Sequence, residues 1–340
     1  MLKTSEMQST ERSHTGLAPG WSITERVDER IEIQGVELWR AALSAESTWG
    51  EVVTGAAADV DGRAMERATF ELLERATMME AMRRGPETFV VRSSDGTVRG
   101  SLRRESVFAE SDDPQRWQPS RSNGVALGTD WASACRSALL ELVERDRLLR
   151  SWRGEGMPEQ VALDAPLLSS IPGYAWQAYR LPMQGGWSAA YETAIVIGFP
   201  TRGGVPLVRG SAADETLKLA LRRAVRECLQ GLAFLWGEDI PNEPPPSSPT
   251  PLYHLDHYLW PGAHAGLRQW LAGAHTQLAA SASPEADATV EWVELTPAGA
   301  QARFRVAQAR CQAALPLFFG DGPAWWTTAL PPALRVHPIA

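Results

Sequence analysis

The sequence predicts a mixed α/β fold with strand-helix units repeated along the chain. Three long stretches have the apolar periodicity of helices, at about 61–84, 129–152 and 214–236. Short apolar or β-branched runs bounded by glycine and proline lie before, between and after them, as strands do. The first two helical stretches also share a residue pattern, which indicates an internal repeat.

Composition and charge limit the class of protein. A chain of 340 residues with 44% hydrophobic and 22% charged residues is expected to fold as a soluble globular protein. Its net charge of -8 argues against nucleic-acid binding, which needs a basic surface. No apolar run approaches the roughly 18 residues of a membrane span, and the N-terminus lacks the apolar core of a signal peptide. We therefore expect a cytoplasmic protein without membrane contact.

The chain is expected to begin with a mobile arm over 1–28, which is polar and interrupted by glycine and proline. The remainder, 29–340, is predicted to form one domain. Its first strand-like material lies at 31–38. The first helix, from about 61 to 84, is ended by Gly85 and the proline that follows it.

A hairpin and the second helix are expected next. Residues 88–93 are typical of a strand, and the turn Asp95-Gly96 allows 98–104 to return as its partner. Thr129 or Asp130 is a good N-cap for the second helix, which extends to about Trp152.

The third helix is predicted to follow strands at 190–200 and 205–210, with Asp214 as its N-cap and its end near Trp236. The proline-rich stretch 241–251 is expected to be an extended surface connection.

The C-terminal region is expected to contain a helix at about 265–281, a strand at 289–295 and a proline-rich extended tail at 331–340. His254, Asp256 and His257 lack a convincing third ligand for a metal site, so ordinary polar packing is favoured for them.

The internal repeat relates residues 63–84 to residues 133–154 at a constant offset of 70 positions. Its polar core is Glu-x-x-Glu-Arg, formed by Glu71, Glu74 and Arg75 in one copy and by Glu141, Glu144 and Arg145 in the other. On a helix these positions are i, i+3 and i+4, so both carboxylates and the guanidinium share one ridge. A solvated face with local ion pairs would explain one copy. Two copies favour a functional site.

The third helix carries Arg223, Glu227 and Gln230 at i, i+4 and i+7, again on one face. Two carboxylates about 4 Å apart repel by roughly 4 kcal/mol at an effective dielectric constant near 20, so carboxylates from several helices can be gathered only with cations. Oxygen-only ligands favour Mg²⁺, and guanidinium groups suit phosphate oxygens. The implied ligand is a Mg-nucleotide, although neither a P-loop nor a GxGxxG motif is present.

The segments around these residues resemble the YcaO superfamily. The resemblance is carried by 68–75, by the Ser-Asn-Gly, Gly-Thr and Glu-x-x-Glu-Arg-Asp pattern of 122–146, and by 222–231. It is closest to the D proteins, the cyclodehydratase components of azole-forming peptide synthetases of the microcin B17 type. The resemblance implies a YcaO-like fold whose repeated strand-helix units surround a helix-lined nucleotide site.

The resemblance also implies roles for particular residues. Glu71, Glu74, Glu141 and Glu144 would be ligands of Mg²⁺. The residues expected around ATP are Arg75, Ser137, Arg145, Arg223, Glu227 and Gln230. The catalytic residues would be Arg145, Gln230 and His337, the last of them in a tail that is expected to be ordered against the nucleotide-binding helices over 334–340.

Three positions depart from the family pattern. Arg67 stands where serine is usual, and Leu232 where arginine is common. The chain ends His-Pro-Ile-Ala, whereas azoline-forming members often end in a PxPxP tail. The last departure bears on the substrate chemistry more than on ATP binding.

The implied function is ATP-dependent activation of backbone amides in a ribosomally made peptide, with cyclodehydration of Cys, Ser or Thr to thiazoline or oxazoline, as in bacteriocin biosynthesis. Thioamide or amidine formation, or a non-catalytic scaffold subunit, are the alternatives. The expected partners are the precursor peptide, a leader-binding protein with an E1-like or winged-helix element, and a flavin dehydrogenase. A homodimer is also possible.

Overall fold

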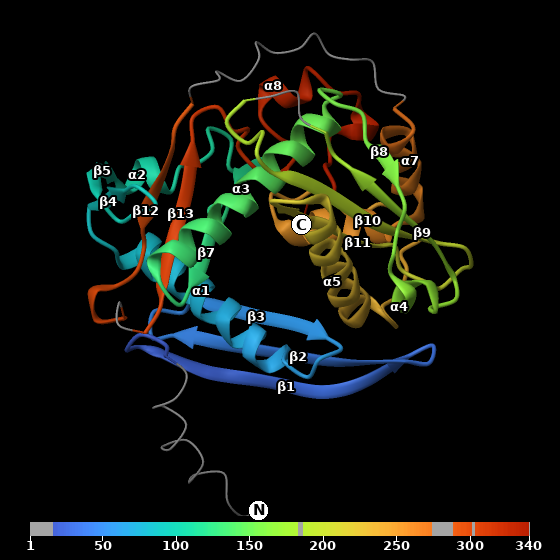
Figure 1. The fold of residues 1–340 in the computed structure, drawn as a ribbon, viewed down its shortest axis with the longest axis horizontal. Helices are drawn as coiled ribbons and strands as arrows, with labels where there is room; N and C mark the ends of the chain where they lie inside the picture. Colours follow the sequence, from blue (N-terminus) through green and yellow to red (C-terminus); the bar gives the residue numbers. More distant parts are fainter. Residues whose placement is uncertain (1–15, 183–185, 274–287, 301–302, 340) are drawn as a thin grey trace, which may run out of the picture.

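The computed structural model describes residues 16–182, 186–273, 288–300 and 303–339. Three long helices lie among several antiparallel sheets (Figure 1). The helices are α1 (Ala64–Arg84), α3 (Trp131–Trp152) and α5 (Leu217–Leu235). This mixed arrangement confirms the predicted fold class.

The sheets bring together strands from distant parts of the chain. A ribbon sheet has the order β1-β2-β3, a second sheet β5-β4-β12-β13-β7, a third β11-β10-β9-β8, and β14 pairs with β6. Figure 1 shows α3 between the second and third sheets. The strands are β1 (Trp21–Ile33), β2 (Val36–Ser47), β3 (Val52–Asp59), β4 (Thr88–Arg92), β5 (Val98–Arg103), β6 (Trp117–Pro119), β7 (Val125–Gly128), β8 (Glu159–Val161), β9 (Tyr174–Arg180), β10 (Glu192–Pro200), β11 (Val208–Asp214), β12 (Val290–Glu294), β13 (Arg305–Cys311) and β14 (Phe318–Gly320).

Shorter helices complete the fold. They are α2 (Arg104–Val107), α4 (Pro166–Ser169), α6 (Pro251–Leu259), α7 (His264–Leu271) and α8 (Ala324–Thr327), with 3-10 turns at Pro261–Ala263, Ala298–Ala300 and Pro332–Leu334. Helix α7 corresponds to the start of the helix predicted at 265–281 but ends at Leu271, with Ala272 as its C-cap. Residues 274–281 of that prediction lie outside the described residues. No helix in the described ranges is long and apolar enough to cross a membrane.

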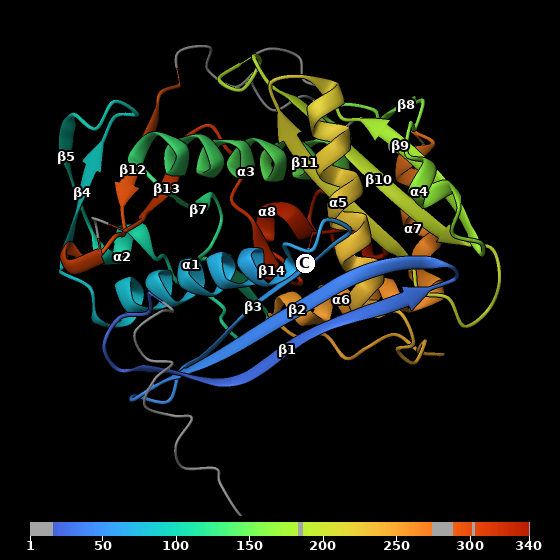
Figure 2. The same ribbon diagram turned by 60° about the horizontal axis from the view of Figure 1, so that its bottom comes forward.

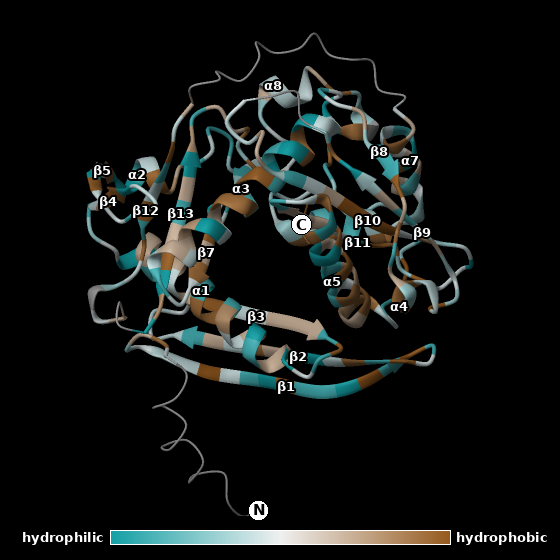
Figure 3. Ribbon diagram, in the orientation of Figure 1, coloured by the Kyte–Doolittle hydropathy of each residue, from teal (hydrophilic) through white to brown (hydrophobic). Residues whose placement is uncertain are grey.

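The predicted N-terminal arm extends too far. Residues 21–28 belong to β1, which pairs with β2 from Trp21 to Ile33. Most β1 side chains are exposed, so the strand lacks the alternation of apolar and polar residues that predicts a half-buried strand (Figure 3). Cross-strand hydrogen bonding, which leaves little trace in the sequence, orders this segment. The part of the arm over 1–15 lies outside the described residues.

The caps of two long helices differ in how well they were predicted. Asp130 caps α3 as predicted, because its carboxylate accepts the Ser133 N–H at 2.8 Å while the Ser133 hydroxyl accepts the Asp130 N–H at 3.2 Å. The prediction that Asp214 caps α5 is wrong. Thr216 is the cap, and Asp214 ends β11.

Each long helix packs closely on the strand that precedes it, and a glycine permits each approach. A Cβ atom at Gly55 in β3 would lie 2.1 Å from the Ala68 carbonyl oxygen of α1. The corresponding glycines are Gly128 in β7, against α3, and Gly210 in β11, against α5. Figure 2 shows α1 lying over the ribbon sheet, and α5 also packs on β3. The three strand-helix pairs are therefore built alike.

We predict that Gly210→Ala lowers the free energy of unfolding by about 2 kcal/mol or more, because overpacking of this size forces the backbone apart. The new Cβ atom would lie 2.2 Å from the Ala224 carbonyl oxygen. Gly203→Ala is the matched control, since its Cβ atom would meet nothing within 4 Å. Urea denaturation measures both variants, and equal stabilities would contradict the close-packing argument.

Candidate functional site

The first glutamate of each Glu-x-x-Glu or Glu-x-x-Gln motif binds the backbone in, or directly before, the strand that precedes its helix. The three bonds are Ala56 N–H to Glu71 (2.9 Å), Gly124 N–H to Glu141 (3.3 Å) and Ser211 N–H to Glu227 (3.0 Å). A carboxylate thus accepts a main-chain donor at the same place in each unit. The third helix is therefore a third copy of the repeat that the sequence shows twice.

The residue three positions later binds the strand of the next unit. The three bonds are Leu127 N–H to Glu74 (2.7 Å), the Ser211 hydroxyl to Glu144 (2.6 Å) and the Gln230 amide to the Ala56 carbonyl (3.1 Å). Helix α1 therefore reaches β7, α3 reaches β11, and α5 returns to β3. The three units form a closed ring, which we call the Glu/Gln ring, of Glu71, Glu74, Glu141, Glu144, Glu227 and Gln230.

Sequence analysis missed the third copy for two reasons. Its second polar residue is Gln230 rather than glutamate, and Gly231 takes the place of the arginine. Its spacing from the second copy is also longer, because 141 to 227 is 86 positions rather than 70. The Glu-x-x-Gln spacing at 227–230 was the available signal.

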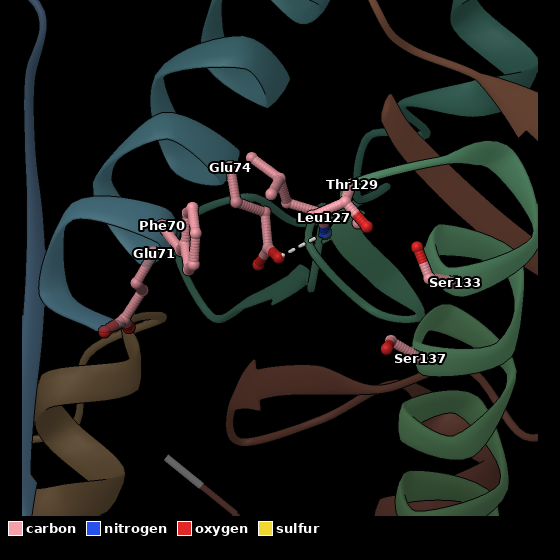
Figure 4. Close-up of a pocket in the computed structure, with 8 residues that line it drawn as sticks. Phe70, Glu71, Glu74, Leu127, Thr129, Ser133 and Ser137 are labelled. Carbon is pink, nitrogen blue, oxygen red and sulfur yellow. Dashed lines mark hydrogen bonds between the residues drawn. The ribbon is translucent and has the colours of Figure 1, made fainter. Parts of the chain in front are cut away.

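Two cavities meet at the ring. The larger, of about 530 Å³, is lined by Glu71, Glu74, Arg75, Arg145, Arg209, Ser211, Glu227, Gln230, Pro338 and Ile339, among others. The smaller, of about 380 Å³, is lined by Glu71, Glu74, Thr129, Ser133 and Ser137, among others. Figure 4 shows Glu74 directed toward Leu127, with Ser133 and Ser137 on α3 across the cavity. The predicted residue Ser137 therefore faces the same space as the first two glutamates.

Burial and mutual repulsion favour the protonated form of several ring carboxyls. Burial and the nearby Glu141 raise the pKa of Glu74 to about 8. Burial also raises the pKa of Glu141 to about 7, although Arg145 opposes the shift. Burial and the nearby Glu144 raise the pKa of Glu227 to about 8. Solvent in the larger cavity reaches the Glu227 side chain and weakens the effect of burial there, so Glu74 and Glu141 dominate the pH response.

The arginines of the site differ in their partners. Arg75 pairs with Glu71 (2.5 Å) and donates to the Thr54 carbonyl (2.7 Å). Arg145 pairs with Glu144 (3.4 Å), but its buried Nε–H has no hydrogen-bond partner. Burial would lower the pKa of Arg145, yet the surrounding carboxylates outweigh it and raise that pKa. A charged donor is thus held in the larger cavity.

Arg223 lies on the face of α5 beside the ring. It pairs with Asp214 (3.4 Å) and donates to the Ala213 carbonyl (3.2 Å). Asp214 also pairs with Arg136 of α3 (3.1 Å), so one carboxylate links the two helices. This role explains why Asp214 is not the cap of α5.

The oxygen-only donors of the ring fit Mg²⁺ in their chemistry, since a divalent cation would favour ionisation of carboxyls that burial keeps protonated. Within the described ranges, no three His, Cys, Asp or Glu side chains are grouped so that they could hold a metal ion. Glu71, Glu74, Glu141 and Glu144 instead lie in series, each bonded to a backbone or hydroxyl donor.

The catalytic prediction for His337 is wrong in its placement. His337 is fully buried and is not among the residues that line the two cavities. Its Nε2–H donates to the Phe318 carbonyl (2.6 Å), and its Nδ1 accepts the Ile339 N–H (3.3 Å). Both ring nitrogens are occupied by backbone groups, so His337 anchors the tail.

The tail itself is ordered over 334–339 and ends beside the larger cavity, as Pro338 and Ile339 line it. The Pro338 carbonyl accepts from Arg209 Nε (2.7 Å), and the Val336 carbonyl accepts from the Tyr258 hydroxyl (2.6 Å). Arg209 was missed by the sequence analysis. Burial lowers its pKa to about 10, and its guanidinium lies 4.9 Å from the Tyr258 ring centroid.

Two departures from the family pattern have structural explanations. Arg67 forms ion pairs with Asp59 and with Asp61 (2.7 Å), which connects α1 to the end of β3. Leu232 is fully buried in the core against β10 and β11. His254 is buried, and Gly320 N–H donates to its Nε2 (3.0 Å), so this imidazole is packed against polar backbone groups.

Comparisons with known proteins identify the family. A family model described as YcaO cyclodehydratase, ATP- and Mg²⁺-binding, matches residues 104–310. This is more than half of the chain, and the chain belongs to the YcaO family. ATP and Mg²⁺ are the cofactors of this family, which confirms the cofactor prediction. No curated protein matches the chain.

Solved structures share the fold at low sequence identity. The YcaO from Methanopyrus kandleri bound with AMPPCP and Mg²⁺ matches with a TM-score of 0.57 and 18% identity, over 89% of this chain and 90% of that one. The E. coli microcin synthetase McbBCD complex matches with a TM-score of 0.56 and 10% identity, over 84% and 87%. A heterocyclase in complex with substrate and cofactor matches with a TM-score of 0.52 and 15% identity, over 85% of this chain and 49% of that one.

We predict that Mg²⁺ binds more tightly, with release of protons, as the pH rises from about 6 to 8.5. The pKa values of Glu74 and Glu141, about 8 and about 7, lie above the ordinary value of 4.5. As the pH rises, the unfolded chain loses these protons at a lower pH than the folded chain does. The free energy of unfolding of the metal-free protein therefore decreases as the pH rises from 4.5 to 8. Calorimetry in buffers of different ionisation enthalpy measures the protons released.

The control for this prediction is Glu110→Gln, a change at an exposed residue outside both cavities. It should leave the pH dependence unchanged, whereas Glu74→Gln should reduce it. Mg²⁺ affinity that is the same at pH 6 and 8.5 would contradict the prediction.

We also predict that acid weakens the anchoring of the tail. Burial lowers the pKa of His254 to about 4 and that of His337 well below its ordinary value of 6.5. The unfolded chain binds protons first as the pH falls below about 6.5, so stability is lost in that direction. His337→Gln keeps a donor for the Phe318 carbonyl without titrating and should retain more stability at pH 5. Thermal melts from pH 7 to 4.5 test this, and parallel curves for both proteins would refute it.

Proposed function

We propose that this chain is an ATP-dependent cyclodehydratase that converts Cys, Ser or Thr of a ribosomally made peptide to thiazoline or oxazoline. The observation that carries the proposal is the Glu/Gln ring: Glu71, Glu74 and Glu227 line one cavity together with three arginines, and Glu141 and Glu144 of α3 complete the ring beside it. Membership of the YcaO family supports ATP as the co-substrate. The structural likeness to a microcin synthetase and a heterocyclase supports the choice of reaction among YcaO chemistries.

In this proposal the substrate supplies its own nucleophile. The side-chain hydroxyl or thiol adds to the preceding carbonyl carbon, and the resulting oxyanion takes the γ-phosphoryl group of ATP. Phosphate then leaves with loss of the amide proton, and the C=N bond of the ring forms. Phosphorylation is needed because an amide oxygen is otherwise a poor leaving group.

The residues of the site would have different roles in binding and catalysis. Glu71, Glu74, Glu141 and Glu144 would hold Mg²⁺, which neutralises phosphate charge when bound. Arg75, Arg223 and Ser137 would contact the phosphates, with Glu227 beside them. Arg145, whose Nε–H has no partner, is placed to stabilise developing oxyanion charge. Gln230 would help to position the nucleotide in the larger cavity, because its bond to the Ala56 carbonyl holds α5 against β3.

The partners in this proposal are a precursor peptide, a leader-binding protein and a flavin dehydrogenase that oxidises the azolines. The E. coli relative is part of a complex, which supports a partnered function. The tail, which ends beside the cavity, would approach the bound peptide. A homodimer would be compatible with this role.

We predict that Glu141→Gln and Glu144→Gln each lower the affinity for Mg-AMPPCP by at least tenfold without unfolding the protein, because each removes a negative charge from the cation site. Calorimetry measures the affinity, and circular dichroism checks the fold. Glu110→Gln is the exposed control. Unchanged affinity in both ring variants would show that the nucleotide site is elsewhere.

The reaction is tested with the leader-binding protein and a leader-bearing peptide. Phosphate release that depends on the peptide, with a mass loss of one water per ring, is expected. A sulfur-for-oxygen exchange or an amine adduct would identify thioamide or amidine formation instead. No peptide-dependent phosphate release would identify a scaffold subunit.

A further inference from the structure

A separate cavity of about 190 Å³ contains two arginines and no carboxylate. Strand β13, the segments 119–123 and 314–317 and the end of α2 form its walls. The polar groups that line it are those of Ser106, Ser120, Arg121, Asn123, Gln308, Arg310 and Cys311. None of the lining residues is acidic.

Neither guanidinium has an anionic partner in the described part of the chain. Arg121 donates to the thioether sulfur of Met82 (3.3 Å), which is a weak acceptor. Arg310 donates to the Ser106 carbonyl (2.6 Å). Glu291 lies opposite Arg310 in the β12–β13 pairing, but the two form no ion pair. Each guanidinium has five N–H donors, and for each of them one hydrogen bond to another described residue is present.

Several partly buried arginines of this protein are paired with carboxylates, whereas Arg147 and Arg209 bond to carbonyl oxygens. Arg92 and Arg305 both bind Glu294, at 2.7 and 2.6 Å, and Arg150 binds Asp146 at 3.0 Å. Burial lowers the pKa of Arg310, and Glu291 offsets this only in part. Removing a cation from water without an anion is unfavourable, and the protein as a whole carries a net charge of -8. Two such cations facing one cavity therefore indicate a site for an anion.

The lining also limits the kind of anion. Val107, Pro119 and Leu317 give the cavity apolar walls beside the arginines. A planar guanidinium binds a carboxylate through two parallel hydrogen bonds, and apolar walls suit the carbon chain that carries it. We propose that this cavity binds a carboxylate on a short organic chain, namely an acidic side chain of a bound peptide. This inference does not depend on the proposed cyclodehydration.

The test compares two peptides that differ only in charge. Acetyl-Ala-Glu-Ala-amide and acetyl-Ala-Gln-Ala-amide are titrated into the full chain by calorimetry, with saturating Mg-AMPPCP present to fill the nucleotide site. We expect the Glu peptide to bind at least tenfold more tightly. Arg121→Gln and Arg310→Gln should each remove most of this difference, and Arg121→Lys should retain part of it.

Arg103→Gln is the matched control, because Arg103 is exposed on β5 and does not line the cavity. It should leave both affinities unchanged, and Mg-AMPPCP binding should be normal in every variant if the fold is intact. Equal affinities for the two peptides would overturn the proposal. Arginine-dependent binding of inorganic phosphate without binding of the Glu peptide would overturn it as well, because the ligand would then be a free anion.

Discussion

Repulsion among the carboxylates of the Glu/Gln ring is the constraint on which the rest of the structure depends. Glu74, Glu141 and Glu227 all have raised pKa values, because burial and like charges disfavour ionisation. Arg75 and Arg145 offset part of this repulsion from the same helices. Backbone and hydroxyl donors from three strands satisfy the carboxylate oxygens. A site strained in this way has an intrinsic affinity for cations.

The ring requires three strand-helix units, and the N-terminal ribbon sheet supplies one of them. Gln230 completes the ring by donating to the Ala56 carbonyl of β3. An ionised carboxylate at this position would face that carbonyl oxygen and could not donate, which explains an amide in the third copy. Arg40 of β2 adds a bond to the Ala233 carbonyl of α5 (2.9 Å), so ribbon and helix are joined twice.

The tail forms another wall of the larger cavity, and hydrogen bonds to its backbone hold it in place. Its polar backbone groups bond to the side chains of Trp152, Tyr258, Arg209, His254 and His337. The tail therefore depends on neutral imidazoles, whereas burial favours protonated carboxyls in the metal-free ring. A fall in pH destabilises the packing of the tail, and a rise in pH destabilises the metal-free Glu/Gln ring. The two walls of the larger cavity therefore respond to pH in opposite directions.

The sequence by itself determined the long helices, a cap for the second of them at Thr129 or Asp130, the first two copies of the repeat and the residue types that suit Mg-nucleotide, because these depend on local periodicity and short spacings. It also indicated the YcaO family through ordered motifs. Only the tertiary structure decided that β1 begins at Trp21, that Gln230 belongs to a third copy, that Arg209 faces the cavity and that His337 is buried. These features arise from contacts between residues distant in sequence, which local patterns do not encode.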